Sequence, residues 1–359
     1  RRVPETGDIA ELTVHFRNLA RSSLPRAPLN AALASGIAVR PDLLRLLLHA
    51  PPEQRQPVLL LAALHDLVLR EPRHPLAEWY GSIVPSPRPA HDPLLMPTVA
   101  DFVAARVVEM SGLLRSRRTQ TNEVGRCALY LLAMSGLDDS TGDLAWLDIG
   151  SSGGLNLQLD LYRYRFEPGG VVGPASPVVL ETGLRGSAPV PTRLPRIAAR
   201  CGIDDSPLDV TDPDAARWLE ACCWPDQVDR FTRLHAAIGI ARDNPPELLA
   251  GDAVASVARA VERMVPRGHP VVTNSWVLSY LPPTRQAEYV RELDLAGVRH
   301  DLTWIFVESP RQTPGLPWPP GIRRPEETHL VRATWRAGER RLEHLARVHP
   351  HGYWAHWSD

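Results

Sequence analysis

A glycine-rich turn directly behind a short apolar run constrains this chain more than any other feature of its sequence. The run is Leu-Ala-Trp-Leu at 144–147, which is typical of a buried parallel strand. The turn follows at 148–156 as Asp-Ile-Gly-Ser-Ser-Gly-Gly-Leu-Asn. Glycines let backbone N–H groups approach a ligand, and a helix expected from about Leu155 to Leu161 would point its positive end at that ligand. The sequence therefore predicts a small-molecule site at this junction.

The spacing of the glycines separates two classes of cofactor. A dinucleotide-binding turn has glycine at its first, third and sixth positions, which here are Gly150, Ser152 and Leu155. Two of the three positions fail, so a nicotinamide-dependent oxidoreductase is a disfavoured alternative. The pattern that fits is acid-x-Gly-x-x-x-Gly from Asp148 to Gly154, in which the acid can reach a cationic amino group above the turn. A cofactor-free α/β protein with an ordinary tight turn is the alternative without a ligand.

The turn resembles motif I of the class I S-adenosylmethionine-dependent methyltransferases. This resemblance implies that the cofactor is S-adenosylmethionine and that its methyl group is transferred to an oxygen or nitrogen of a small molecule. A protein of the same fold that binds the cofactor or a nucleotide without catalysis is the second hypothesis. The cofactor-binding residues implied at the turn are Asp148, Gly150, Ser151, Ser152, Gly153, Gly154 and Asn156.

Four further apolar segments follow the turn, and helical segments separate them. The expected strands are 197–204, 247–253, 270–276 and 302–308, and the expected helices are 214–241, 253–265 and 284–296. Strands that alternate with helices predict a doubly wound parallel sheet, in which ligands bind at the carboxyl ends of the strands.

The resemblance implies roles for residues at these strand ends. Asp204 would accept hydrogen bonds from the ribose hydroxyls, and Asp252 with Ala253 would contact the adenine. Asn274 and Ser275 would border both cofactor and substrate. Two aromatic residues nearby, Trp276 and Tyr280, either line the substrate pocket or belong to the core, and the core is the favoured interpretation of Tyr280.

The segment 121–127, Thr-Asn-Glu-Val-Gly-Arg-Cys, lies just ahead of the first strand. Glu123 and Arg126 either line the pocket, with Glu123 orienting a ligand or acting as a base, or form a helix-end ion pair with Thr121 or Asn122 as the cap. This segment resembles a largely uncharacterised, methyltransferase-like family of high-GC bacteria, catalogued as a domain of unknown function. The resemblance is also carried by the segments 150–156, 202–209, 224–227 and 275–282.

The rest of the chain completes the expected architecture. Segments 329–336 and 341–348 predict an antiparallel pair that would close a seven-stranded, mostly parallel, class I methyltransferase-like α/β sheet. Residues 1–120 predict a helical region that covers the substrate, with helices at 9–20, 41–49 and 57–69. The methyltransferase domain would occupy 121–359 and carry a β-hairpin insertion at about 162–193.

Composition narrows the classes of function. The chain has no lysine, which excludes a Walker A lysine and a pyridoxal Schiff base, and its net charge of -1 gives no footprint for nucleic acid. Its 4 cysteines lack paired spacing, and its 13 histidines lack a carboxylate-rich neighbourhood, so no metal site is expected. No apolar run is long enough to cross a membrane. The expected setting is the cytoplasm.

Overall fold

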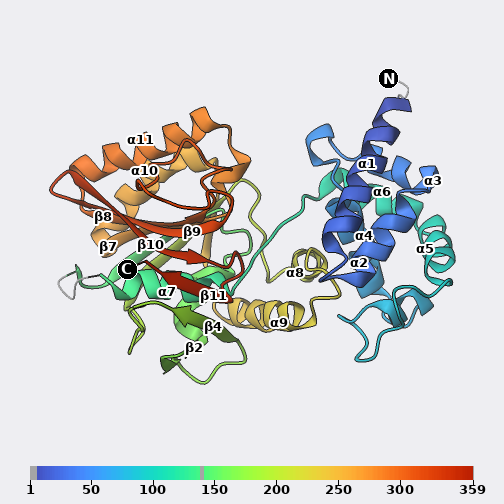
Figure 1. Cartoon of the computed structure of the whole chain (residues 1–359), viewed down its shortest axis with the longest axis horizontal. Coiled ribbons are helices and arrows are strands. Elements are labelled where there is room, and N and C mark those ends of the chain that lie inside the picture. Colours follow the sequence, from blue (N-terminus) through green and yellow to red (C-terminus); the bar gives the residue numbers. More distant parts are fainter. Residues whose placement is uncertain (1–5, 138–140, 359) are drawn as a thin grey trace. The chain divides into compact units, whose positions relative to one another are not determined.

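The computed structural model of the chain describes residues 6–137 and 141–358. These residues form two compact units (Figure 1). One unit is helical and consists of the residues up to Thr121 together with Asp212–His235. The other contains the sheet and consists of Asn122–Thr211 together with the residues from Ala236 onward.

The helical unit is built around α4, Pro57–Arg70. Every side chain from Pro57 to Val68 except Val58 is buried, as expected of a helix that is apolar on all sides. Helix α8, Pro213–Ala221, packs against α4, and both helices begin with proline, whose missing N–H costs nothing in a first turn. The other helical elements of this unit are α1 Thr6–Ser23, α2 Pro28–Ile37, α3 Pro41–Leu46, η1 Leu47–His49, η2 Pro52–Gln54, η3 Pro75–Trp79, α5 Leu95–Ala104 and α6 Val107–Ser116.

The single helix expected over 214–241 is wrong. The structure has two helices there, α8 and α9, the latter spanning Val228–Asp243. Proline lacks a backbone donor and disfavours helix in the residue before it, so Pro225 breaks the pattern between them. Asp212 caps α8, because its Oδ1 accepts the N–H of Asp214 at 2.9 Å.

The second unit contains one mixed sheet of eleven strands among the described residues. Its order is β3-β2-β4-β11-β10-β9-β8-β7-β1-β5-β6. The five strands from β8 to β6 pair in parallel, and β8, β9, β10 and β11 pair antiparallel in turn. The strands are β1 Leu144–Ile149, β2 Arg163–Glu167, β3 Gly170–Val172, β4 Val179–Arg185, β5 Ile197–Asp204, β6 Glu247–Ala250, β7 His269–Ser275, β8 Leu302–Glu308, β9 Thr328–Arg336, β10 Glu339–Val348 and β11 Trp354–Trp357.

The fold is thus α/β, but its sheet has eleven strands in place of the seven expected. The additional strands lie in two places in the chain. The segment expected to hold a hairpin contains the antiparallel pair β2–β3 and also β4, which is parallel to β2. The aromatic C-terminal segment forms β11, which pairs with both β4 and β10.

Helices cover both faces of this sheet. Helices α10, Ala253–Met264, and α11, Pro283–Arg299, pack against each other and over one face, while α7, Arg126–Ser135, lies on the other (Figure 1). The buried core beneath α10 and α11 includes Leu147, Phe306 and Trp335. The remaining helical elements of this unit are η5 Leu155–Leu161, η6 Val265–Arg267 and η7 Leu278–Tyr280.

The helix expected after the glycine-rich turn is a short 3-10 segment. It spans Leu155–Leu161, and its backbone leaves helical geometry at Gln158. A seven-residue segment that breaks at Gln158 carries a weaker dipole than a long α-helix. The helix-dipole argument for ligand binding at the turn therefore stays a prediction with less support.

Candidate functional site

The parallel part of the sheet places several predicted residues at one edge. Its order is β6-β5-β1-β7-β8, and the chain order of these strands is 3-2-1-4-5. The direction of winding reverses between β1 and β7, and open α/β sheets bind ligands at such a switch point, outside the carboxyl ends of the strands. The turn 150–154 follows β1, and Trp276 follows β7. The candidate site is therefore this edge of the sheet unit.

The turn after β1 depends on glycine at two positions. Gly150 has φ +72° and Gly154 has φ +69°, in the left-handed region. A Cβ atom at Gly150 would lie 2.2 Å from Cγ2 of Val277, and one at Gly154 would lie 2.6 Å from Cγ of Pro246. The absence of side chains thus lets other loops of this edge pack on the turn.

Most backbone donors of the turn are used within the protein. Gly150 and Ser151 donate to the Ile203 carbonyl at 2.7 and 3.2 Å, and Gly154 donates to the Ser151 carbonyl at 2.8 Å. These N–H groups therefore do not form the ligand cradle that the sequence suggested.

Unlike these N–H groups, two serine hydroxyls of the turn make no hydrogen bond within the described part of the protein. Ser151 and Ser152 are 2% and 3% exposed, and neither Oγ has a hydrogen-bond partner among the residues the structure describes. A buried hydroxyl without a partner is costly, which makes both groups candidates for contact with a ligand.

Asp204 ends β5 and holds the turn. Its Oδ2 accepts the N–H of Ser152 at 2.9 Å, and its Oδ1 accepts the N–H of Ser206 at 2.8 Å. Each carboxylate oxygen has a further lone pair, so these bonds leave acceptor capacity for a ligand diol. Asp204 is therefore both a structural residue and a possible ligand acceptor.

Asp148 is buried beneath the turn at 2% exposure. Trp146 Nε1 donates to Thr273 Oγ1 at 2.8 Å, and that hydroxyl donates to Asp148 Oδ1 at 2.6 Å. Burial raises the pKa of Asp148 to about 7, while the Thr273 hydrogen bond and the charge of Arg126 oppose the rise. This carboxyl group therefore gains a proton close to neutral pH.

Glu308, at the end of β8, is a site residue that sequence reasoning missed. It is fully buried, and its Oε1 accepts from Asn274 Nδ2 at 3.0 Å and from the N–H groups of Val277 and Leu278 at 2.9 and 3.1 Å. Burial raises its pKa to about 7, and the two backbone bonds oppose the rise. An acid closing an apolar run was the signal used for Asp204, and it applied here too.

The loop after β7 carries Trp276 and Tyr280. Trp276 has φ +54°, an unusual conformation for a bulky residue, and its indole Nε1 is buried without a hydrogen-bond partner among the described residues. Tyr280 is 85% exposed, so its interpretation as a core residue is wrong. Asn274 and Ser275, just before the loop, are both buried; Asn274 Oδ1 accepts from Trp304 Nε1 at 2.7 Å.

The segment ahead of α7 links three parts of this unit. Asn122 Nδ2 donates to the Ser151 carbonyl at 2.9 Å, and Arg126 Nη1 donates to the Ser275 carbonyl and hydroxyl, both at 3.0 Å. Glu123 is 4% exposed; its Oε1 accepts from Gly125 N at 3.1 Å, and its Oε2 lies 3.1 Å from Nδ1 of His351. Glu123 thus lies near the turn, with both oxygens facing protein groups.

The alternative in which Thr121 or Asn122 caps the helix of this segment is wrong. Helix α7 begins after Gly125, and no side chain caps it, so neither Thr121 nor Asn122 has that role.

Three of the predicted cofactor-binding residues have structural roles: Asp252, Ala253 and Asn156. Asp252 caps α10 through a 2.9 Å bond from Ala255 N, and it pairs with Arg285 Nη2 at 2.7 Å on the surface. Ala253 is the first residue of that helix. Asn156 is buried in η5, where its Oδ1 lies 3.4 Å from the Cys127 sulfur.

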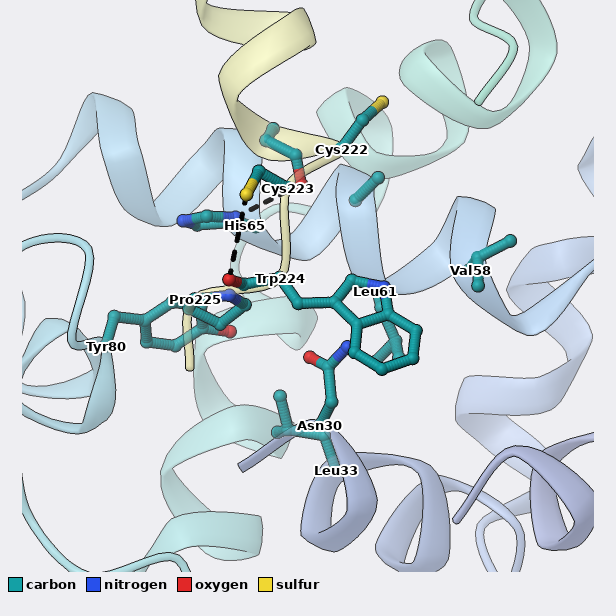
Figure 2. A pocket seen from close by; sticks show the side chains of 12 residues that line it. Asn30, Leu33, Val58, Leu61, His65, Tyr80, Cys222, Cys223, Trp224 and Pro225 are labelled. Carbon is teal, nitrogen blue, oxygen red and sulfur yellow. Dashed lines mark hydrogen bonds between the residues drawn. The ribbon is translucent and has the colours of Figure 1, made fainter. Parts of the chain in front are cut away.

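The helical unit contains a small cavity (Figure 2). Its volume is about 10 Å³, which corresponds to a single water molecule. His65 lies at its wall and is held by the Ala221 carbonyl at 3.1 Å and Ser82 Oγ at 2.8 Å, and burial lowers its pKa to about 4. Figure 2 shows Trp224 across this space beside Asn30. The cavity is too small for an organic ligand.

The described residues contain no group of three or more histidine, cysteine, aspartate or glutamate side chains arranged to hold a metal ion. Across the same residues, no helix is both long enough and apolar enough to span a lipid bilayer.

Comparison with known proteins identifies one family. No curated protein and no solved structure matches the chain, so these comparisons lend no support to membership of the methyltransferase superfamily. A family model described as "Uncharacterized protein conserved in bacteria (DUF2332)" matches residues 14–357. The expected resemblance to a bacterial domain of unknown function is confirmed. The chain belongs to this family of proteins conserved in bacteria.

Proposed function

We propose that the sheet unit binds S-adenosylmethionine at the carboxyl edge of β1, β5 and β7 and transfers its methyl group to an oxygen or nitrogen of a small molecule. The observation that carries this proposal is the pair of buried, unpartnered hydroxyls on Ser151 and Ser152, on a turn at the switch point of the sheet. Ser152 and Leu155 stand where a dinucleotide-binding turn has glycine, so the turn disfavours a dinucleotide, and its resemblance to motif I favours an adenosyl sulfonium.

The residues present fit such a cofactor in part. Asp204 keeps one lone pair on each carboxylate oxygen for the ribose hydroxyls, and Ser152 lies beside it through its N–H bond. The Trp276 indole N–H, buried without a partner among the described residues, is a further donor. Asp148 is nearly inaccessible and already accepts from Thr273, so we propose that it supports the turn from beneath and makes no contact with the cofactor.

A bound S-adenosylmethionine would supply an already activated methyl group. The bond from sulfur to the methyl carbon breaks as the acceptor's oxygen or nitrogen attacks that carbon, sulfur keeps the electron pair, and the acceptor loses a proton. The protein's task is then to align the acceptor and to receive that proton. Glu123 can orient a ligand, but proton transfer to it would require one of its contacts, with Gly125 or His351, to open.

Binding is tested by calorimetry with S-adenosylmethionine and S-adenosylhomocysteine on the full chain. Ser151→Ala and Ser152→Ala should each weaken binding by about 1 kcal/mol, roughly fivefold, while leaving stability unchanged, because neither hydroxyl has a partner to lose. Thr303→Val is the matched control. Its buried hydroxyl bonds His269 at the opposite edge of the sheet, so it should lose stability and keep affinity.

Two results would contradict different parts of the proposal, one the cofactor and the other the catalysis. Absence of heat with both ligands at about 1 mM contradicts the proposed cofactor. Binding without formation of S-adenosylhomocysteine across a panel of small alcohols, phenols and amines favours a non-catalytic binding protein.

A further inference from the structure

Three basic side chains form a row across β10, β11 and β4. Arg347 on β10 lies opposite His356 on β11, and His356 lies opposite Arg185 on β4. Residues opposed in register on neighbouring strands project from the same face of a sheet. Because β8 and β9 separate β10 from β7, this row lies at a different part of the sheet from the Gly150 turn.

The row borders a surface cavity, which we call the hollow. Arg185, Arg347, His356 and Trp354 line a cavity of about 300 Å³. Small-molecule sites begin at about this size. The cavity is therefore large enough for a small organic ion.

The two arginines at this hollow differ in how far their charges are compensated. Arg347 is partly neutralised, because its Nη1 donates to Glu327 at 2.7 Å, and its guanidinium carbon lies 5.4 Å from the centre of the Trp354 ring. Arg185 has no hydrogen bond and no ion pair among the described residues. Positive side chains set side by side on adjacent strands repel each other. The cavity thus presents one uncompensated guanidinium beside a compensated one.

His356 completes the set of donors. Its Nδ1 lies 3.2 Å from Arg347 Nη2, and an arginine can only donate, so Nδ1 of the neutral imidazole accepts. That assignment leaves the proton on Nε2, which is then a donor.

We propose that this hollow binds a small organic anion through a carboxylate or phosphate group. The planar guanidinium fork of Arg185 matches the paired oxygens of either group, Arg347 adds positive charge, His356 Nε2 adds a donor, and Trp354 provides an apolar wall. The proposal is independent of the cofactor proposed above, because it rests on different strands and different residues.

The test uses the full chain with pyrophosphate and citrate as probes, measured by calorimetry at constant ionic strength. Arg185→Gln should weaken binding of the accepted probe at least about tenfold. Arg165→Gln is the matched control, because Arg165 is an exposed arginine on the neighbouring strand β2 that is already paired with Glu181. Its affinity should stay within about twofold of wild type.

The two probes distinguish the chemical group that the hollow binds. Binding of pyrophosphate alone assigns a phosphate group, and binding of citrate alone assigns a carboxylate. The proposal is overturned if neither probe binds at about 10 mM, or if Arg165→Gln weakens binding as much as Arg185→Gln does. Thermal melting of both variants should match wild type, since both side chains are exposed.

Discussion

The carboxylate of Asp204 accepts the backbone N–H of Ser152 at 2.9 Å, so the acid that ends β5 fixes the turn that follows β1. The contact joins two neighbouring parallel strands at their carboxyl ends. It also couples any ligand contact made by Asp204 to the conformation of the turn. A change at Asp204 will therefore act on stability as well as on binding.

Asp204→Ala should lower the free energy of unfolding by about 2 kcal/mol, because the N–H groups of Ser152 and Ser206 lose a charged acceptor. It should also weaken S-adenosylmethionine binding by about 1.5–3 kcal/mol. Asp204→Asn keeps one acceptor oxygen and should lose less of both. Urea titration and calorimetry measure the two effects. Normal stability in Asp204→Ala would contradict the structural role.

Gly150→Ala should destabilise the protein more than Gly142→Ala. The two glycines have nearly the same φ, +72° and +73°, so an added Cβ meets the same backbone strain of about 1 kcal/mol at each. At Gly142 nothing lies within 4 Å of that Cβ, whereas at Gly150 it would lie 2.2 Å from Val277. The overpacking should add about 1–3 kcal/mol at Gly150 alone. Equal losses for both variants in urea unfolding would show that the loop of Val277 yields freely.

Asp148→Asn should gain stability relative to wild type as the pH rises. Burial raises the pKa of Asp148 from 3.8 to about 7, so between these values the folded protein holds a proton that the unfolded chain has released. The free energy of unfolding of wild type then falls by about 1.4 kcal/mol per pH unit on account of this group, and the fall ends above about pH 7. Asparagine has no such proton. Glu308→Gln should behave in the same way.

The pH effect of Asp148 is measured as the difference in the free energy of unfolding between Asp148→Asn and wild type at each pH. Burial lowers the pKa values of His65, His269 and His344 to about 4, so these groups raise stability with pH between about 4 and 6.5. They are present in both proteins and cancel in the difference. Urea unfolding at about pH 5, 6, 7 and 8 provides the measurement. A difference that does not vary with pH would mean that Asp148 is ionised throughout.

Asp252→Ala should cost about 1 kcal/mol of stability through the lost cap on α10, whereas Asp252→Ser keeps a capping oxygen and should cost little. The exposed pair with Arg285 adds little to either loss. If Asp252 contacts the adenine, as the resemblance to methyltransferases implies, both variants should weaken cofactor binding. Wild-type affinity in Asp252→Ser would leave Asp252 with a structural role alone.

The five parallel strands could be predicted from the sequence to within three residues at each end. The strands β5 and β8 have the expected bounds, whereas β6 ends at Ala250, three residues earlier than expected. The C-terminal pair β9 and β10 was also predicted, because a Gly-containing turn separates two regular strands. Such local signals need no knowledge of distant partners.

What could not be predicted depends on contacts between distant parts of the chain. No local pattern indicates that β4 pairs with β11, since these two strands lie far apart in the sequence and their pairing depends on the assembly of the whole sheet. The burial of Glu308 depends likewise on the loop of Val277, which follows a different strand. Two helix errors had local causes instead: the 3-10 geometry after Gly154 and the break at Pro225.

The pairing of β11 has a consequence for how the chain is made. In the described sheet, β2, β3 and β4 join the other strands through β11, which is four residues long. During synthesis these three strands are made well before β11, so the edge of β4 that pairs with β11 stays unpaired until the end of the chain is made. Pairing between strands so distant in sequence is slow, and an unpaired edge can pair with a wrong strand. Charged side chains such as Arg165 and Glu181 on the waiting strands discourage such errors. Trimming from Trp354 onward would leave the three strands without a sheet to join.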